Sequence, residues 1–106
     1  MIYCFDLDGT LCTSSPDDYT KALPLQERID SVNRLFQAGY YIKIYTARGM
    51  TTNTDCQELT EWQLEEWDVD YDELIMGKPF ADVYIDDKGV NELDFFKEKA
   101  WVINQE

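Results

Sequence analysis

The residues best suited to chemistry lie at 6–11, Asp-Leu-Asp-Gly-Thr-Leu, directly after an apolar run at 2–5. The apolar run predicts a short buried strand, and Gly9 and Thr10 predict the turn that ends it. Two carboxylates two positions apart at a strand end share one small volume, and their repulsion raises the pKa of one of them. Such pairs are typical of sites where a cation binds or where one carboxyl acts as an acid. The segment therefore indicates a carboxylate nucleophile, a proton-transferring carboxylate and Mg²⁺.

Two simpler interpretations compete with this one. An Asp-x-Asp-Gly run is also found in ordinary acidic turns, which is an alternative for these residues taken alone. A calcium loop of the EF-hand type requires an oxygen ligand at its fifth position and glycine at its sixth. Those positions hold Thr10 and Leu11, so the calcium loop is excluded.

Three further segments support the catalytic interpretation: Tyr-Thr-Ala-Arg at 45–48, Gly-Lys-Pro at 77–79 and Ile-Asp-Asp-Lys at 85–88. Each of them alone is a weak signal. In this order, and together with residues 6–10, they make the chain resemble the haloacid dehalogenase (HAD) superfamily of phosphohydrolases over nearly its whole length.

The resemblance implies a division of labour for phosphoryl transfer. Asp6 is the candidate nucleophile, which forms an aspartyl phosphate. Asp8 is the candidate acid for the leaving oxygen and later the base for the hydrolytic water. Thr46 offers a hydroxyl and a backbone N–H to a phosphoryl oxygen, and Lys78 supplies a point charge to Asp6 and to the phosphoryl oxygens.

Three more residues are candidates for holding the substrate. Gly9 allows the backbone to turn close to the phosphoryl group, and Thr10 stabilises that loop. Arg48 is either a substrate contact or a charge at the rim of the site, and Lys88 is a weaker candidate of the same kind.

The second acidic pair, Asp86 and Asp87, predicts the rest of a Mg²⁺ site together with Asp6 and Asp8. Mg²⁺ prefers oxygen ligands, usually one or two carboxylates plus waters. The resemblance implies that one of the second pair ligates directly, with a slight preference for Asp87, and that the backbone carbonyl of Asp8 also ligates.

These positions have structural alternatives as well. Thr46 at a strand end often satisfies only its own turn, and a lysine before proline is commonly a solvated loop residue. The Asp86–Asp87 pair is an acidic turn if nothing binds there. Asp6 and Asp8 nearby would make such a turn repulsive without a cation.

Apolar runs alternate with helical patterns along the chain. The patterns predict strands at 2–5, 41–45, 74–76, 83–85 and 101–103, a polar loop at 12–22, and helices at 25–36, 54–67 and 91–99. Pro24 suits the first turn of the first helix, and Gly39 suits its end. Leu59 and Trp62 are expected on the inner face of the second helix.

Strands that alternate with helices predict parallel pairing with right-handed crossovers. The fold class is therefore α/β, a three-layer Rossmann-like parallel sheet. The site of such a sheet lies beyond the carboxyl ends of its strands, where Asp6, Thr46 and Asp86 are expected. The spacing of the motifs leaves no room for a cap domain, so residues 1–106 are expected to form one capless domain with an open site.

The net charge of −13 argues against nucleic acid and anionic lipid as partners, because both are negatively charged. A small phosphorylated substrate then needs local positive charge, which Arg48, Lys78, Lys88 and Mg²⁺ provide. No apolar run approaches the roughly 18 residues of a membrane span, and no secretory signal is visible.

The three cysteines, Cys4, Cys12 and Cys56, match neither a zinc nor a CxxC spacing, which favours reduced thiols and a cytoplasmic location. Cys4 is expected in the core, Cys56 on a helix, and Cys12 near the nucleophile loop, where it could line the site. The chain has no histidine, so proton transfer falls to carboxylates.

The leading functional hypothesis is a Mg²⁺-dependent phosphomonoester phosphatase. Within the HAD superfamily, the motifs resemble those of small bacterial or phage proteins linked to capsule and sugar-phosphate metabolism, and those of the phosphatase domain of polynucleotide kinases. The net charge of −13 favours sugar phosphates or nucleotides over nucleic-acid ends as substrates. The alternatives are a non-catalytic module that binds phosphate or Mg²⁺, and transfer to an acceptor other than water. The tryptophans at 62, 67 and 101 are expected in the core, although an exposed pair would suit a homo-oligomer.

Overall fold

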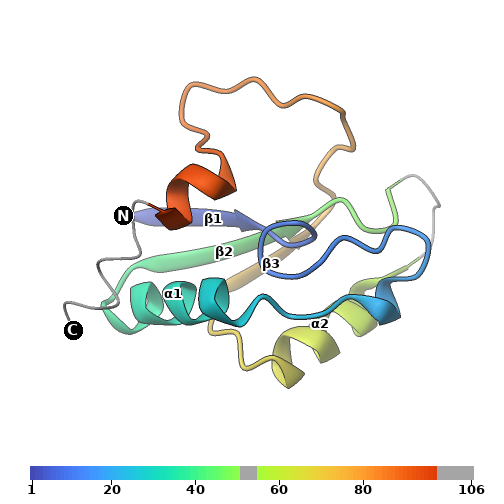
Figure 1. Cartoon of the computed structure of the whole chain (residues 1–106), viewed down its shortest axis with the longest axis horizontal. Coiled ribbons are helices and arrows are strands. Elements are labelled where there is room, and N and C mark those ends of the chain that lie inside the picture. The colour runs from blue at the N-terminus through green and yellow to red at the C-terminus, as the bar shows by residue number, and fades with distance from the viewer. Residues whose placement is uncertain (51–54, 98–106) are drawn as a thin grey trace.

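The fold is built on a parallel sheet whose strands alternate with helices (Figure 1). A computed structural model describes residues 1–50 and 55–97. The elements in chain order are β1 (Ile2–Asp6), the short 3₁₀ helix η1 (Tyr19–Lys21), α1 (Gln26–Gln37), β2 (Tyr41–Thr46), α2 (Gln57–Glu66) and β3 (Glu73–Met76). Residues 92–97 form a further helical segment.

The three strands lie side by side in the order β1-β2-β3 and run parallel. Asp6 is the partner of Tyr45 across β1 and β2, and Thr46 is the partner of Met76 across β2 and β3. The carboxyl ends of all three strands therefore meet at one edge of the sheet. This confirms the predicted α/β class with a parallel sheet.

One face of the sheet carries the core. Phe5, Ile42 and Ile44 are buried on it and belong to the same apolar cluster as residues of α1 and α2. Successive crossovers of one hand place both helices on the same face. Ile2 and Cys4 point away from that face and are exposed. The sheet and the described helices on its one face thus make two of the three predicted layers, and the prediction of a buried Cys4 is wrong.

Helix α1 follows the predicted pattern closely. Its residues Ile29, Val32 and Leu35 are buried, and Gly39 follows it with φ of +97°, a backbone conformation that glycine adopts without steric cost. Pro24 lies before the helix rather than in its first turn.

Helix α2 turns a different face to the core than its apolar residues suggest. Thr60, Gln63 and Leu64 are buried, whereas Trp62 is 58% exposed and Leu59 is half-buried. The predicted inner face is therefore wrong, because two polar side chains of α2 have buried polar partners. Trp67 packs partly against the core, and Trp101 lies outside the described residues.

The predicted strand at 83–85 is not formed. Residues 80–90 are all exposed, with Ile85 at 95%, and Figure 1 shows this stretch as an open arch between β3 and the helical segment at 92–97. Its polar contacts are local: Ala81 N donates to Tyr84 Oη at 3.1 Å, and Tyr84 Oη donates to Pro79 O at 2.5 Å. The predicted strand at 101–103 lies outside the described residues.

The helical segment that follows the arch returns to the sheet. The ring centroid of Phe95 lies 5.4 Å from that of Phe5 and 5.9 Å from that of Tyr3. Glu92 forms an ion pair with Arg28 of α1 at 3.3 Å. The predicted helix at 91–99 is therefore present over 92–97, and the arch is attached to the body at both of its ends.

Candidate active site

Three of the predicted site residues meet at the carboxyl edge of the sheet. Asp6 is the last residue of β1, and Thr46 is the last residue of the neighbouring β2. Lys78 follows β3 by two residues, and its Nζ atom lies 3.4 Å from Asp6 Oδ1. The backbone N–H groups of Gly77 and Lys78 donate to the carbonyl of Thr46 at 3.1 and 3.0 Å, which ties the loop after β3 to the end of β2.

The carboxyl group of Asp6 is partly buried, and this raises its pKa above the ordinary value of an aspartate. The ammonium group of Lys78 and the backbone N–H of Leu7 act in the opposite direction, and the charge of Asp8 adds to the rise. A carboxylate in such surroundings is less well solvated than one in water. It therefore gains more from a cation or an electrophile placed beside it.

Lys78 is enclosed rather than solvated. Its side chain is 9% exposed, and its Nζ atom lies 4.6 Å from the ring centroid of Tyr45 and 4.2 Å from that of Tyr84. Both distances are within the range of cation–π attraction. The alternative of a solvated loop lysine is therefore wrong.

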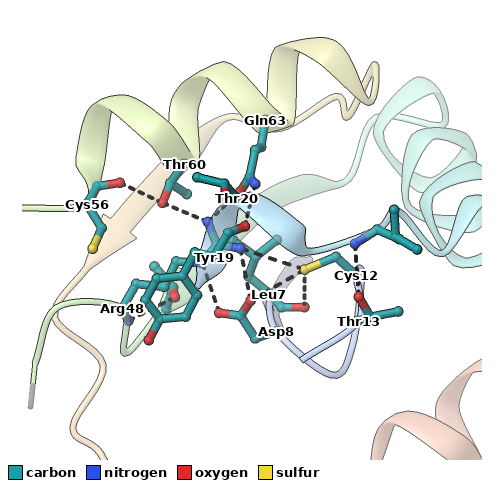
Figure 2. A network of polar contacts seen from close by, with 12 residues as sticks. Leu7, Asp8, Cys12, Thr13, Tyr19, Thr20, Arg48, Cys56, Thr60 and Gln63 are labelled. Carbon is teal, nitrogen blue, oxygen red and sulfur yellow. Dashed lines mark hydrogen bonds and ion pairs between the residues drawn. The ribbon is translucent and has the colours of Figure 1, made fainter. Parts of the chain in front are cut away.

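Asp8 is held by Arg48, which is not at the rim of the site (Figure 2). Arg48 Nε donates to Asp8 Oδ2 and Arg48 Nη2 to Asp8 Oδ1, each at 2.9 Å. The side chain of Arg48 is 0% exposed and that of Asp8 is 19% exposed. The interpretation of Arg48 as a rim charge is therefore wrong, and its place as a direct substrate contact stays a prediction.

Arg48 also contacts residues that sequence reasoning did not single out. Its Nη1 atom donates to Thr60 Oγ1 at 3.2 Å and to Gln63 Oε1 at 2.5 Å, and its guanidinium lies 4.7 Å from the ring centroid of Tyr19 (Figure 2). Burial alone would lower the pKa of Arg48, but the hydrogen bonds and charge of Asp8 raise it. The apolar pattern gave no signal for Thr60 and Gln63, because it predicted Leu59 and Trp62 on the inner face of α2.

Cys12 lies in the same network, as the sequence interpretation allowed. Its thiol donates to Asp8 Oδ1 at 3.5 Å, and Arg48 Nη2 lies 3.9 Å from its sulfur. Burial and the nearby charge of Asp8 raise the pKa of Cys12 to about 12. The thiol is therefore neutral at physiological pH.

The turn after β1 has the geometry expected of it. Gly9 has φ of +82°, and its N–H donates to Cys12 O at 2.8 Å. Thr10 is buried, and Arg28 Nη1 of α1 lies 3.2 Å from its carbonyl oxygen. This loop is fixed by the backbone, and binding of substrate by Gly9 and Thr10 stays a prediction.

Thr46 makes the local contact that was its structural alternative. Its hydroxyl oxygen accepts a hydrogen bond from Arg48 N at 3.1 Å, and the residue is 1% exposed. The contact closes the turn after β2. A role of this hydroxyl toward a phosphoryl group stays a prediction.

The second acidic pair is not gathered with the first. Asp86 and Asp87 lie in the exposed arch, where Asp86 Oδ1 accepts from Lys88 N at 3.0 Å. Within residues 1–50 and 55–97, no group of three or more His, Cys, Asp or Glu side chains is close enough to hold a metal ion. Asp6 at the end of β1 offers a partly exposed carboxylate, and one carboxylate with waters fits a Mg²⁺ ion.

A pocket of about 210 Å³ lies next to Arg48 and Gly77. It is reached from the turns after β2 and β3 and from the start of α2. Its lining is formed by Arg48, Gly49, Met50, Asp55, Cys56, Gln57, Met76 and Gly77. The pocket thus adjoins the loop that carries Lys78.

Comparison with known proteins identifies solved structures that are similar to this chain. The chain is 32% identical to a protein from Vibrio cholerae of known crystal structure, over 98% of this chain and 97% of that one, with a TM-score of 0.78. It is 25% identical to a chain of the Pnkp1/Rnl/Hen1 complex, over 92% of this chain and 33% of that one, with a TM-score of 0.59. No protein-family model and no curated protein matches the chain.

A third similar structure is D,D-heptose 1,7-bisphosphate phosphatase from B. bronchiseptica, in complex with magnesium and phosphate. The identity is 17% over 97% of this chain and 63% of that one, with a TM-score of 0.55, so this likeness concerns the fold alone. No helix among the described residues is long and apolar enough to cross a membrane. The chain belongs to the same family as the Vibrio cholerae protein, and its fold is HAD-like.

Proposed function

We propose that this protein is a Mg²⁺-dependent phosphomonoester phosphatase that works through an aspartyl phosphate on Asp6. The observation that carries the proposal is the position of Asp6 at the end of β1, with Lys78 Nζ 3.4 Å away and the carboxyl of Asp8 in the next turn. A nucleophile, a fixed cation and a second carboxylate are the groups that phosphoryl transfer through a covalent intermediate requires.

In the first step, a carboxylate oxygen of Asp6 forms a bond to phosphorus and the ester P–O bond breaks. The leaving oxygen takes a proton from the carboxyl of Asp8. In the second step, Asp8 accepts a proton from a water molecule as that water attacks phosphorus, and Asp6 is released as a carboxylate. Lys78 neutralises charge on the phosphoryl oxygens and on Asp6 throughout.

Asp6 and the backbone carbonyl of Asp8 would hold the Mg²⁺ ion, with a contribution from Asp86 or Asp87 as the sequence predicts. The ion supplies charge stabilisation to the phosphoryl oxygens when bound. Asp86 and Asp87 are exposed in the arch. Asp6 and the backbone carbonyl of Asp8 are therefore the metal-binding groups that the end of β1 positions.

The proposed substrate is a small phosphorylated molecule, of sugar-phosphate or nucleotide type. The net charge of −13 opposes a polyanionic partner, so a nucleic-acid end is the less favoured substrate.

The test is hydrolysis of an aryl phosphate by the wild type with Mg²⁺ and with chelator, and by the Asp6→Asn and Asp17→Asn variants. Asp17 is exposed in the loop after β1 and makes a matched control. We expect metal-dependent turnover that is lost in Asp6→Asn, unchanged in Asp17→Asn, and accompanied by unchanged circular dichroism. Full activity in Asp6→Asn would refute the mechanism. No turnover by the wild type on aryl, sugar or nucleotide phosphates would favour a binding module.

A further inference from the structure

The contacts of Arg48 assign it a role that its position at the end of the Tyr-Thr-Ala-Arg segment does not reveal. We propose that Arg48 is a positioning residue for Asp8, held in place by Gln63 and Thr60 of α2, and that it does not bind the substrate. This inference rests on the proposed function, because it concerns the carboxyl that transfers the proton.

Every N–H group of the Arg48 guanidinium faces an acceptor within the protein. The group has five N–H donors in a fixed planar arrangement. Two of them meet the two oxygens of Asp8 at 2.9 Å, and two meet Thr60 Oγ1 and Gln63 Oε1. The fifth faces the sulfur of Cys12 at 3.9 Å. No donor is left for a phosphoryl oxygen unless one of these contacts breaks.

The two side chains of the pair differ in exposure, and the difference shows which of them can reach a ligand. The side chain of Arg48 is 0% exposed, whereas that of Asp8 is 19% exposed. Arg48 therefore lies behind Asp8, on the protein side. A guanidinium bound to both carboxylate oxygens fixes the plane of the carboxylate as well as its position. Arg48 thus fixes the orientation of the Asp8 carboxylate from the protein interior, while part of the Asp8 side chain stays exposed to solvent.

Arg48 is itself held from two other elements (Figure 2). Gln63 accepts from Arg48 through Oε1 and donates through Nε2 to Tyr19 O at 2.8 Å, so its amide group is fixed at both ends. The ring of Tyr19 covers the guanidinium at 4.7 Å. Thr60 Oγ1, which accepts from Arg48, donates to Cys56 O at 2.8 Å. Helix α2 and the loop before α1 therefore position Asp8 through Arg48.

A positioning role has a kinetic signature that a substrate contact lacks. Proton donation by Asp8 matters when the leaving oxygen is strongly basic, as in an alkyl phosphate, and matters little for a nitrophenolate. Misplacing Asp8 should therefore slow formation of the aspartyl phosphate, and with it kcat/KM, more for alkyl phosphates than for nitrophenyl phosphate, whereas hydrolysis of the intermediate is common to both. Loss of a substrate contact made equally in the ground state and the transition state would instead raise KM for both kinds of substrate.

The experiment compares kcat and KM of the wild type, Arg48→Lys, Gln63→Met and Gln37→Met on nitrophenyl phosphate and on glycerol phosphate. Lysine keeps the charge but cannot bind both oxygens of Asp8. Gln63→Met leaves the Arg48–Asp8 pair in place and removes its support. Gln37 is exposed at the end of α1 and makes the matched control. Thermal unfolding of each variant reports whether the fold is intact.

We expect Arg48→Lys to lower kcat/KM for glycerol phosphate by about tenfold more than kcat/KM for nitrophenyl phosphate. Gln63→Met should show the same selectivity to a smaller extent, and Gln37→Met none. Equal losses of kcat/KM on both substrates in the two site variants, or a rise in KM with kcat unchanged, would overturn the inference, because a lost substrate contact acts on both substrates alike. A wild type that hydrolyses neither substrate would overturn the proposed function first and this inference with it.

Discussion

Lys78 reaches Asp6 past the middle strand of the three that the structure describes, because β2 lies between β1 and β3. The 3.4 Å between Lys78 Nζ and Asp6 Oδ1 joins the end of the first strand to the loop after the third. The ring of Tyr45, near the end of β2, lies against the same ammonium group. All three strands thus contribute to the surroundings of one carboxylate.

Replacing Lys78 by Met is expected to move the acid limb of the pH profile to higher pH. The pKa of Asp6 is already raised by burial, and Lys78 opposes that rise. Because the nucleophile must be ionised, a higher pKa means that activity is lost at a higher pH as the solution is acidified. The measurement is kcat/KM against pH for Lys78→Met, with Lys43→Met on β2 as the control. An acid limb that stayed in place or moved to lower pH would contradict the assignment.

Replacing Asp86 and Asp87 by Asn is expected to raise the Mg²⁺ concentration needed for half-maximal activity. Mg²⁺ binds carboxylate oxygens more strongly than neutral amides. The double variant Asp82→Asn, Asp94→Asn removes the same charge from two other exposed positions and is the matched control. Equal Mg²⁺ dependence of the two double variants and the wild type would exclude the second acidic pair from the metal site.

Substitutions of two isoleucines, one in β2 and one in the arch, are expected to differ in their effect on the free energy of unfolding. Ile44 is 0% exposed in β2, and Ile85 is 95% exposed in the arch. Ile44→Ala should lower the free energy of unfolding by about 2–5 kcal/mol through lost burial and a cavity. Ile85→Ala should change it by less than about 0.5 kcal/mol. Urea denaturation of both variants gives the comparison, and a large loss in Ile85→Ala would show that the arch packs against something.

Alkylation should distinguish the cysteines. Burial raises the pKa of Cys12 to about 12, and only the thiolate reacts. Iodoacetamide should therefore modify Cys12 more slowly than the exposed Cys4, with the rate at Cys12 rising steeply through the alkaline range. Peptide mass mapping of partly modified protein measures both sites. Modification of Cys12 first at mildly alkaline pH would contradict the geometry around Asp8.

Local patterns predicted β1, β2 and β3 from short apolar runs and α1 from its apolar helical face, which is buried. The strand-end rule for parallel sheets also predicted that Asp6 and Thr46 would lie together. The rule did not hold for Asp86, because an apolar run such as 83–85 does not show whether its backbone finds a partner strand.

The burial of Arg48 could not be predicted from its type, because arginine is usually exposed. What keeps it inside is a set of acceptors from distant parts of the chain, Asp8, Thr60 and Gln63. The same contacts explain why Thr60 and Gln63 of α2 face the interior. The periodicity of apolar residues cannot predict these contacts, because both side chains are polar.

The arch at 80–90 has a consequence for how the molecule opens. Stretches with few buried contacts exchange their amide hydrogens through local openings that cost much less free energy than global unfolding. Native-state hydrogen exchange should therefore be fast at 80–90 and slow at the centre of β2. Tyr84, in that stretch, covers one side of Lys78. Each opening of the arch would thus expose the ammonium group of Lys78 to water. The electrostatic attraction between Lys78 and Asp6 would therefore fluctuate with the local opening of residues 80–90.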